Sequence, residues 1–125
     1  MSATSETPTP EAIKIAEQND RFRTTWGADF TVPGQIVMTR GVADLSPAVK
    51  TIIMQRVQGF DTFTEDNDPY GDRSFGAFDI EMAGESHSIF WKIDLYDTDY
   101  AMGSDDPTNL TATRRVLTIL HASEY

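Results

Sequence analysis

The chain has 125 residues, 39% of them hydrophobic and 10% aromatic, and its net charge is −10. This composition is typical of one globular domain, and the acidity disfavours nucleic acid and anionic membranes as direct ligands. The sequence contains no cysteine, so disulfides and thiolate metal sites are excluded and a reducing, cytoplasmic location is expected. Neither a signal peptide nor a membrane-spanning apolar run is predicted.

Residues 1–10 are rich in Ser, Thr and Pro and are predicted to form a disordered tail, whereas residues 11–125 are predicted to form a single α+β domain. The first helix is expected to begin at Glu11 and to end at Gly27, because apolar residues recur between them at steps of three and four.

A short strand is predicted over residues 35–40, with Ile36 and Met38 on one side of it. The clearest helix start follows, since Ser46 is a good N-cap and Pro47 fits the first helical position. Gly59 is expected to end this helix. Its apolar face comprises Val49, Ile52, Ile53, Val57 and Phe60.

Two strands over residues 74–82 and 87–97 are predicted to form an antiparallel hairpin, joined by a four-residue loop. In that register Phe78 faces Trp91 and Gly76 faces Ile93. One face of the hairpin is then apolar and the other is mixed, as expected in a two-layer domain.

A last helix is predicted to start near Asp106 and Pro107, with Arg114, Arg115 and His121 outside its apolar stripe. That stripe comprises Leu110, Thr113, Val116, Leu117 and Leu120. The predicted fold is therefore α+β and two-layered: a three-stranded, mainly antiparallel sheet packed against helices, in the order α-β-α-β-β-α.

Residues 61–106 carry most of the charge, with 13 acidic residues against two basic ones and aromatic residues between them. A surface that is acidic and aromatic suits a basic protein partner, and we expect these carboxylates to converge on one outward patch. The residues expected to contact the partner are Asp66, Asp68, Tyr70, Asp72, Asp94, Tyr96, Asp97, Asp99 and Tyr100.

Within this stretch, residues 64–72 have some of the spacing of a calcium-binding loop, because Asp66, Asp68 and Gly71 fall at expected positions. The position that needs a bidentate Glu is Ala77, so an EF-hand is not expected. The sequence favours an ordered turn in which Asp and Asn side chains bond to the backbone. A looser Mg²⁺ or Mn²⁺ site is the alternative.

Five motifs carry a resemblance to a known family: AEQNDRFR at residues 16–23, MTRGV at 38–42, FTEDNDPYG at 63–71, FWKID at 90–94 and TRRVLTI at 113–119. Over roughly residues 12–125 the chain resembles a bacterial family catalogued as domain of unknown function 3768. That family is common in alphaproteobacteria, often on plasmids and other mobile elements. The resemblance implies a context, since small acidic proteins on mobile elements are often antagonists of host defence. It implies no role for any residue.

Three functional hypotheses follow. The leading one is a non-enzymatic, acidic protein-binding domain that inhibits a nucleic-acid-binding defence complex, such as a CRISPR effector or a restriction enzyme. The second is a small metal-dependent hydrolase or nuclease that uses clustered carboxylates. The third is a homo-oligomeric structural or small-ligand module. The second would use Asp66, Asp68, Asp79 and Glu81, and the third would pack Phe75, Phe90 and Tyr96 against a second copy. No cofactor is expected, and His87 and His121 are expected to be structural or exposed.

Overall fold

The computed structural model describes residues 8–125, so residues 1–7 of the predicted tail lie outside the described residues, and the first helix already begins at Pro10. The helices are α1 (Pro10–Thr24), α2 (Arg40–Ala43) and α3 (Pro47–Gln58), and a short 3-10 turn, η2 (Ala122–Glu124), follows the last strand. The strands are β1 (Gly34–Met38), β2 (Phe75–Met82), β3 (Glu85–Tyr96) and β4 (Arg114–His121). None of the helices in this part of the chain is both long and apolar enough to cross a bilayer.

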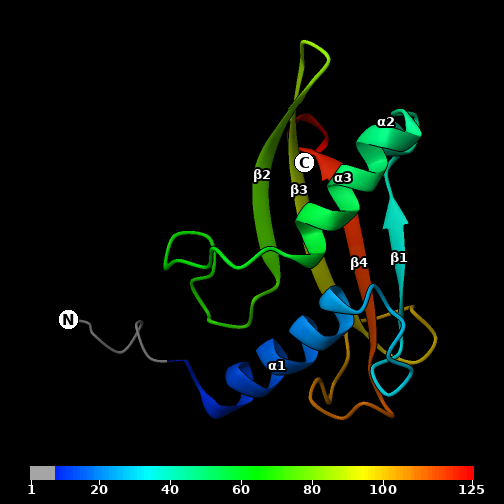
Figure 1. Ribbon diagram of the computed structural model, residues 1–125. Coiled ribbons are helices and arrows are strands. Elements are labelled where there is room, and N and C mark those ends of the chain that lie inside the picture. Colours follow the sequence, from blue (N-terminus) through cyan, green and yellow to red (C-terminus); the bar gives the residue numbers. More distant parts are fainter. Residues whose placement is uncertain (1–7) are drawn as a thin grey trace.

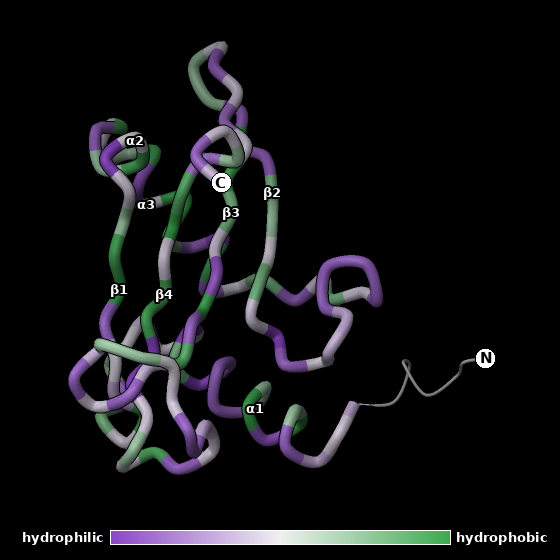
Figure 2. Tube along the Cα trace, turned by 180° about the vertical axis from the view of Figure 1, so that it is seen from behind, coloured by the Kyte–Doolittle hydropathy of each residue, from purple (hydrophilic) through white to green (hydrophobic). Residues whose placement is uncertain are grey.

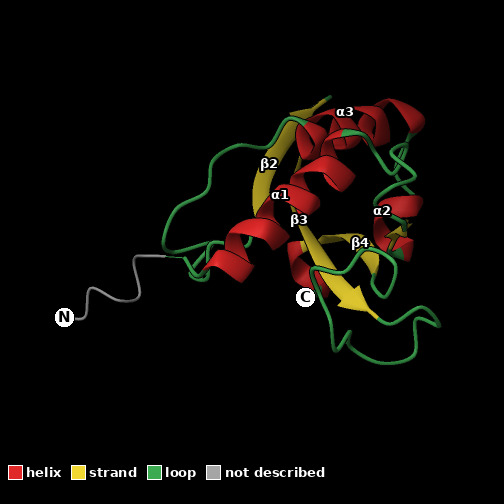
Figure 3. Cartoon of the chain, turned by 90° about the horizontal axis from the view of Figure 1, so that it is seen from below, coloured by secondary structure: helices red, strands yellow, loops and turns green. Residues whose placement is uncertain are grey.

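The strands form one sheet in the order β1-β4-β3-β2, with β1 parallel to β4 and the other two pairs antiparallel (Figure 1). The helices cover one face of this sheet (Figure 3), and the core between them joins Phe22, Val42 and Ile53 of the helices to the strands. Figure 2 shows the other face, which α1, α2 and α3 leave uncovered. The predicted α+β class is confirmed, but the three-stranded sheet is wrong because there are four strands and one pair is parallel.

Both long helices form where they were predicted, but α1 begins one residue before the predicted Glu11 and ends at Thr24, before the predicted Gly27, whereas α3 follows its predicted signals. Ser46 caps α3, its Oγ accepting a hydrogen bond from the backbone N–H of Val49 at 3.3 Å, and Pro47 is the first helical residue. Gly59 is the C-cap, as predicted. In α1, Thr9 Oγ1 accepts a hydrogen bond from the N–H of Ala12 and so satisfies one of the free donors of the first turn.

The β2–β3 hairpin has a two-residue turn, so the predicted four-residue loop is wrong. Ala83 and Gly84 have φ values of 54° and 81°, and two consecutive positive φ angles are typical of a type I′ turn. Phe78 therefore pairs with Ile89, and Gly76 pairs with Trp91. The register differs from the predicted one by two residues, and because side chains alternate with period two, the predicted buried face is unchanged.

The predicted last helix is wrong, because residues 114–121 form β4. This strand lies between β1 and β3, so both of its edges are paired with neighbouring strands. Its side chains are buried or half-buried on both faces of the sheet. Leu117 and Ile119 are fully buried against the helices, and Leu120 is 5% exposed on the opposite face. A central strand that is buried on one face and half-buried on the other shows weak polar–apolar alternation, and its largely apolar run can be mistaken for one face of a helix.

Candidate functional site

The predicted contact residues lie on two loops that leave the same end of the sheet, and on the last residues of β3 between them. The antiparallel pairing places the start of β2, the end of β3 and the start of β4 together. Residues 59–74 lead into β2 along the sheet edge, and residues 97–113 join β3 to β4 below the sheet (Figure 1). The acids of the hairpin tip, Glu81 and Glu85, lie at the opposite end of the strands. The acidic residues thus form two groups at this end of the sheet, and Glu81 and Glu85 lie apart from them at the other end.

The first loop is an ordered turn built by its own polar side chains. Asn67 Oδ1 accepts a hydrogen bond from the N–H of Thr64 at 2.9 Å, and Asp68 Oδ1 accepts one from the N–H of Arg73 at 2.9 Å. Gly71 has a φ of 72°, which a glycine adopts without steric cost. The favoured interpretation of this segment, a turn with Asp and Asn side chains bonded to the backbone, is confirmed. Burial raises the pKa of the Asp68 carboxyl, and its bond from the Arg73 N–H opposes that rise.

Arg73 links the first loop to α1 by an ion pair with Asp20. Its backbone has a φ of 54°, an uncommon conformation for a residue with a side chain. Its Nη1 lies 2.6 Å from Asp20 Oδ2, and its guanidinium lies 5.1 Å from the centre of the Phe63 ring. The next acid, Asp72, accepts a hydrogen bond on Oδ1 from Ser74 Oγ, and its carbonyl accepts one from Asn19 Nδ2. These contacts give the loop a fixed position beside β2.

The second loop is also held by an aspartate. Asp97 Oδ1 accepts hydrogen bonds from the N–H groups of Asp99 at 3.1 Å and Ala101 at 3.0 Å. The tight turn that results gives Tyr100 a φ of 58° and leaves its side chain exposed. Ser104 then bonds to Thr113, which returns the chain to β4.

The predicted contact residues differ in their surroundings. Asp66, Tyr70, Asp99 and Tyr100 are exposed, whereas Asp68, Asp72, Asp94, Tyr96 and Asp97 are half-buried. Tyr70 has the most exposed ring among them, at 77%. Asp94 Oδ2 lies 3.3 Å from Lys92 Nζ. Within residues 8–125, the other five aspartates of this set form no ion pair with a basic side chain. The two loops therefore present largely uncompensated negative charge.

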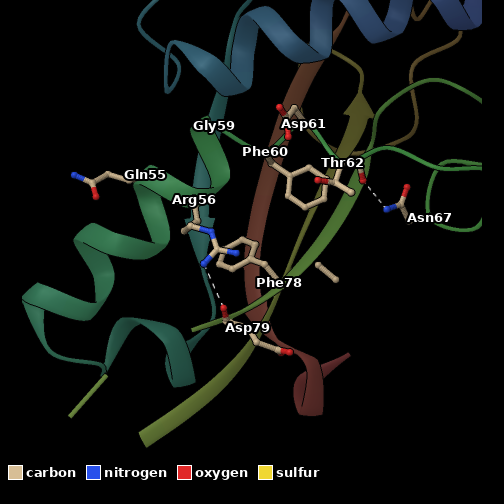
Figure 4. Close-up of a pocket in the computed structure, with 10 residues that line it drawn as sticks. Gln55, Arg56, Gly59, Phe60, Asp61, Thr62, Asn67, Phe78 and Asp79 are labelled. Atoms are coloured by element: carbon tan, nitrogen blue, oxygen red, sulfur yellow. Dashed lines mark hydrogen bonds between the residues drawn. The ribbon is translucent and has the colours of Figure 1, made fainter. Parts of the chain in front are cut away.

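A hollow of about 500 Å³ lies beside β2, and sequence reasoning did not anticipate it. Figure 4 shows that the end of α3, the start of the first loop and the middle of β2 surround it. The Arg56 guanidinium lies 4.7 Å from the centre of the Phe78 ring, and its Nη1 donates a 3.3 Å hydrogen bond to the carbonyl of Asp79. No sequence motif marks this hollow, because it depends on α3 packing against β2.

Two buried arginines were also missed. Arg115, predicted to lie outside an apolar stripe, is fully buried in β4, and its Nε and Nη2 donate to Asn19 Oδ1 at 2.7 Å and Gln18 Oε1 at 2.9 Å. Burial lowers the pKa of Arg115 to about 10. Arg23 is 2% exposed; it donates to the carbonyl of Val57 and lies 3.0 Å from Asp20. Their partners are mostly carbonyl and amide oxygens of other elements, so both arginines join elements of the fold.

The histidines lie together on the covered side of the sheet. The rings of His87 and His121 are 5.7 Å apart, and both side chains are half-buried. His87 Nε2 lies 3.4 Å from Glu85 Oε1, and His121 Nε2 lies 3.2 Å from the carbonyl of Gly41. These contacts link the hairpin, β4 and α2.

The carboxylates named for the hydrolase hypothesis belong to different parts of the fold. Asp66 and Asp68 lie in the first loop, whereas Asp79 and Glu81 lie on β2, where Asp79 accepts a hydrogen bond from Ser88 Oγ at 2.7 Å. Across residues 8–125, no three His, Asp or Glu side chains are grouped closely enough to hold a metal ion.

Comparison with known proteins adds a family. The model of the family described as protein of unknown function, DUF3768, matches residues 38–124, which is more than half of the chain. No curated protein and no solved structure matches the chain.

Proposed function

Because the chain belongs to the DUF3768 family, whose description assigns no activity, we propose a function from the geometry of its loops. The protein is an acidic protein-binding domain whose partner presents a basic surface. One observation carries the proposal: six aspartates lie on two ordered loops and the strand end between them, at one end of the sheet. They are Asp66, Asp68, Asp72, Asp94, Asp97 and Asp99.

The chemistry of this end supports a basic protein as the partner. Carboxylates without a basic neighbour attract lysine and arginine, which speeds association and selects the partner. The exposed rings of Tyr70 and Tyr100 add aromatic contact area of the kind that dominates interface energies. Because the turns already fix the loops, the partner need not order them on binding, which reduces the entropy lost.

We extend the proposal to a nucleic-acid-binding complex of host defence, such as a CRISPR effector or a restriction enzyme. The stretch 61–106 carries a net charge of −11 in a domain only about 30 Å across. Duplex DNA of that length carries about 18 phosphate charges, so the charge densities are of the same order. A basic groove that binds DNA would therefore also attract this surface.

Charge reversal tests the proposal without disturbing the turns. Asp66 and Asp99 are exposed, and within residues 8–125 their carboxylates make no hydrogen bond or ion pair. The double variant Asp66→Lys/Asp99→Lys should abolish binding to a defence complex and restore the phage restriction that the unaltered protein suppresses. Phage plating efficiency on cells that carry a restriction or CRISPR system measures this, and melting temperature checks the fold.

The matched control is Asp44→Lys/Glu85→Lys, which raises the net charge by the same amount at the opposite end of the sheet. This variant should still suppress restriction. Equal activity of the two double variants would disprove a role for the loops, and an unaltered protein that suppresses no system would disprove the anti-defence role.

The hydrolase hypothesis is supported by no grouping of ligands in the part of the chain that the structure describes, and calorimetric titration with Mg²⁺, Mn²⁺ and Ca²⁺ tests it directly. Absence of both heat and a thermal shift would remove it.

The oligomer hypothesis has one observation in its favour. Phe75 and Phe90 stack edge to face on the uncovered side of the sheet, with ring centres 5.1 Å apart, and both are half-buried. Tyr125 lies against both rings but is itself 74% exposed. Light scattering at high concentration tests the hypothesis, and a monomeric mass would count against it.

A further inference from the structure

Within residues 8–125, the outer edge of β2 carries backbone groups that no other strand uses. The sheet ends at β2, which is eight residues long. The carbonyl of Ser74 accepts a hydrogen bond from Ile93 of β3, whereas the carbonyl of Asp79 accepts one from the Arg56 side chain outside the sheet. In an antiparallel pair the backbone groups alternate in direction, so the N–H and C=O of Ala77, Asp79 and Glu81 point away from β3.

The hollow beside β2 lies where a fifth strand would run. A neighbouring strand lies about 4.8 Å from β2, and alternate side chains of that strand would face the helix layer. The rings of Phe60 and Phe78 line the hollow on that side, and Ala77 and Asp79 line it along β2 (Figure 4). An incoming extended segment would therefore meet free backbone groups on one side and aromatic surface below.

The edge is acidic apart from one arginine. Asp61 lines the hollow, and Asp79 and Glu81 extend exposed carboxylates from the edge strand. Arg56 lies across this edge, and its hydrogen bond to Asp79 is long, at 3.3 Å, and exposed to solvent. An exposed bond of that length is weak, so a backbone N–H could replace the guanidinium at little cost.

We propose that an extended, basic segment of a partner protein pairs with β2 as a fifth strand of the sheet. Main-chain hydrogen bonds would supply affinity, and the carboxylates would select lysine or arginine at alternate positions. A second copy of this chain does not fit, because two-fold pairing about Asp79 would place the Asp79 carboxylates of the two copies opposite each other, and like charges opposite each other are destabilising. The inference rests on the proposed function and adds the mode of docking.

A short peptide that alternates lysine and valine is the probe. Its binding should slow hydrogen exchange at the amides of Ala77, Asp79 and Glu81 about ten-fold or more, as measured by NMR. The same peptide N-methylated at alternate residues, which cannot complete the ladder, should give no such protection. The variant Ala77→Pro lacks one outward N–H and should therefore bind the peptide more weakly. The variant should still fold, because proline is tolerated on edge strands.

A second variant keeps the test decisive if Ala77→Pro fails to fold. Arg56→Met removes the competing charge and the bond to Asp79 but retains an apolar stem over Phe78, so it should bind the peptide several-fold more tightly. Unchanged or weaker binding by Arg56→Met would contradict the inference.

Charge-neutralising pairs separate this inference from the proposed function. Asp79→Asn/Glu81→Gln should weaken peptide binding more than Asp66→Asn/Asp99→Asn does, and a remote control, Glu17→Gln/Asp44→Asn, should leave it unchanged. If the loop pair alone weakens binding and the β2 amides stay unprotected, the edge inference is wrong and the acidic loops remain the binding surface. If the peptide does not bind at all, the edge inference is wrong too, whereas the phage-plating result still decides the proposed function.

Discussion

Gly76 lies directly opposite Trp91 on the neighbouring strand, and the indole occupies the space that a side chain at position 76 would need. Trp91 is fully buried, and its ring meets Phe60 edge to face with centres 5.6 Å apart. The glycine is therefore required here for space and not for an unusual backbone angle.

We expect Gly76→Ala to lower the free energy of unfolding by about 1–3 kcal/mol, the usual cost of overpacking a filled core. A Cβ at position 76 would overlap Trp91 Nε1, and the buried indole has little room to move. Urea denaturation followed by tryptophan fluorescence measures the change. Gly103→Ala is the control, because its Cβ would meet nothing closer than the Leu95 carbonyl at 3.9 Å. Equal effects of the two substitutions would contradict the packing argument.

Asn19→Leu should destabilise the protein by about 3 kcal/mol or more. Asn19 accepts the Nε–H bond of buried Arg115 and donates to the carbonyl of Asp72, so its loss removes one of the two side-chain partners of a buried charge and leaves the Asp72 carbonyl without this donor. Chemical denaturation measures the loss. Glu17→Leu on the exposed side of the same helix should change stability by no more than about 0.5 kcal/mol. A stable Asn19→Leu variant would mean that Arg115 finds other partners.

Asp68→Asn should raise the melting temperature of the protein more at neutral pH than in acid. Because burial raises the pKa of Asp68 in the folded state, its contribution to stability is full below the unfolded pKa and is lost as pH rises through the folded pKa. Asparagine keeps an acceptor for the Arg73 N–H and has no charge to bury. The melting temperature of the variant minus that of the parent should thus be larger at pH 7 than at about pH 3. A difference that shrinks with rising pH would contradict this. Asp68→Ala, which lacks the acceptor, should lose stability at both pH values.

Ala83→Asn should raise the free energy of unfolding by about 0.5–1 kcal/mol, since asparagine followed by glycine is the preferred sequence for a turn with two positive φ angles. Thermal denaturation measures the gain. The converse variant, Gly84→Ala, should destabilise because position 84 has a φ of 81°. A stable Gly84→Ala variant would indicate that the turn changes type.

The candidate site was predictable only where its contacts are local. The aspartate and asparagine turns of residues 64–72 follow from side chains that bond to backbone a few residues away, as do the cap at Ser46 and the helix end at Gly59. The hollow beside β2 escaped prediction because Arg56 and Phe78 meet only when α3 packs on the hairpin.

The sequence by itself determined the start and end of α3, the hairpin strands and which of their faces is buried, because caps act over three or four residues and strand faces repeat every two. Tertiary structure decided the rest. It made residues 114–121 a central strand, since neighbours on both sides bury it regardless of its helix-like pattern. It also enclosed Arg115 beside Asn19 and brought the two acidic loops to one end of the sheet, because each of these depends on contacts between residues distant in the chain.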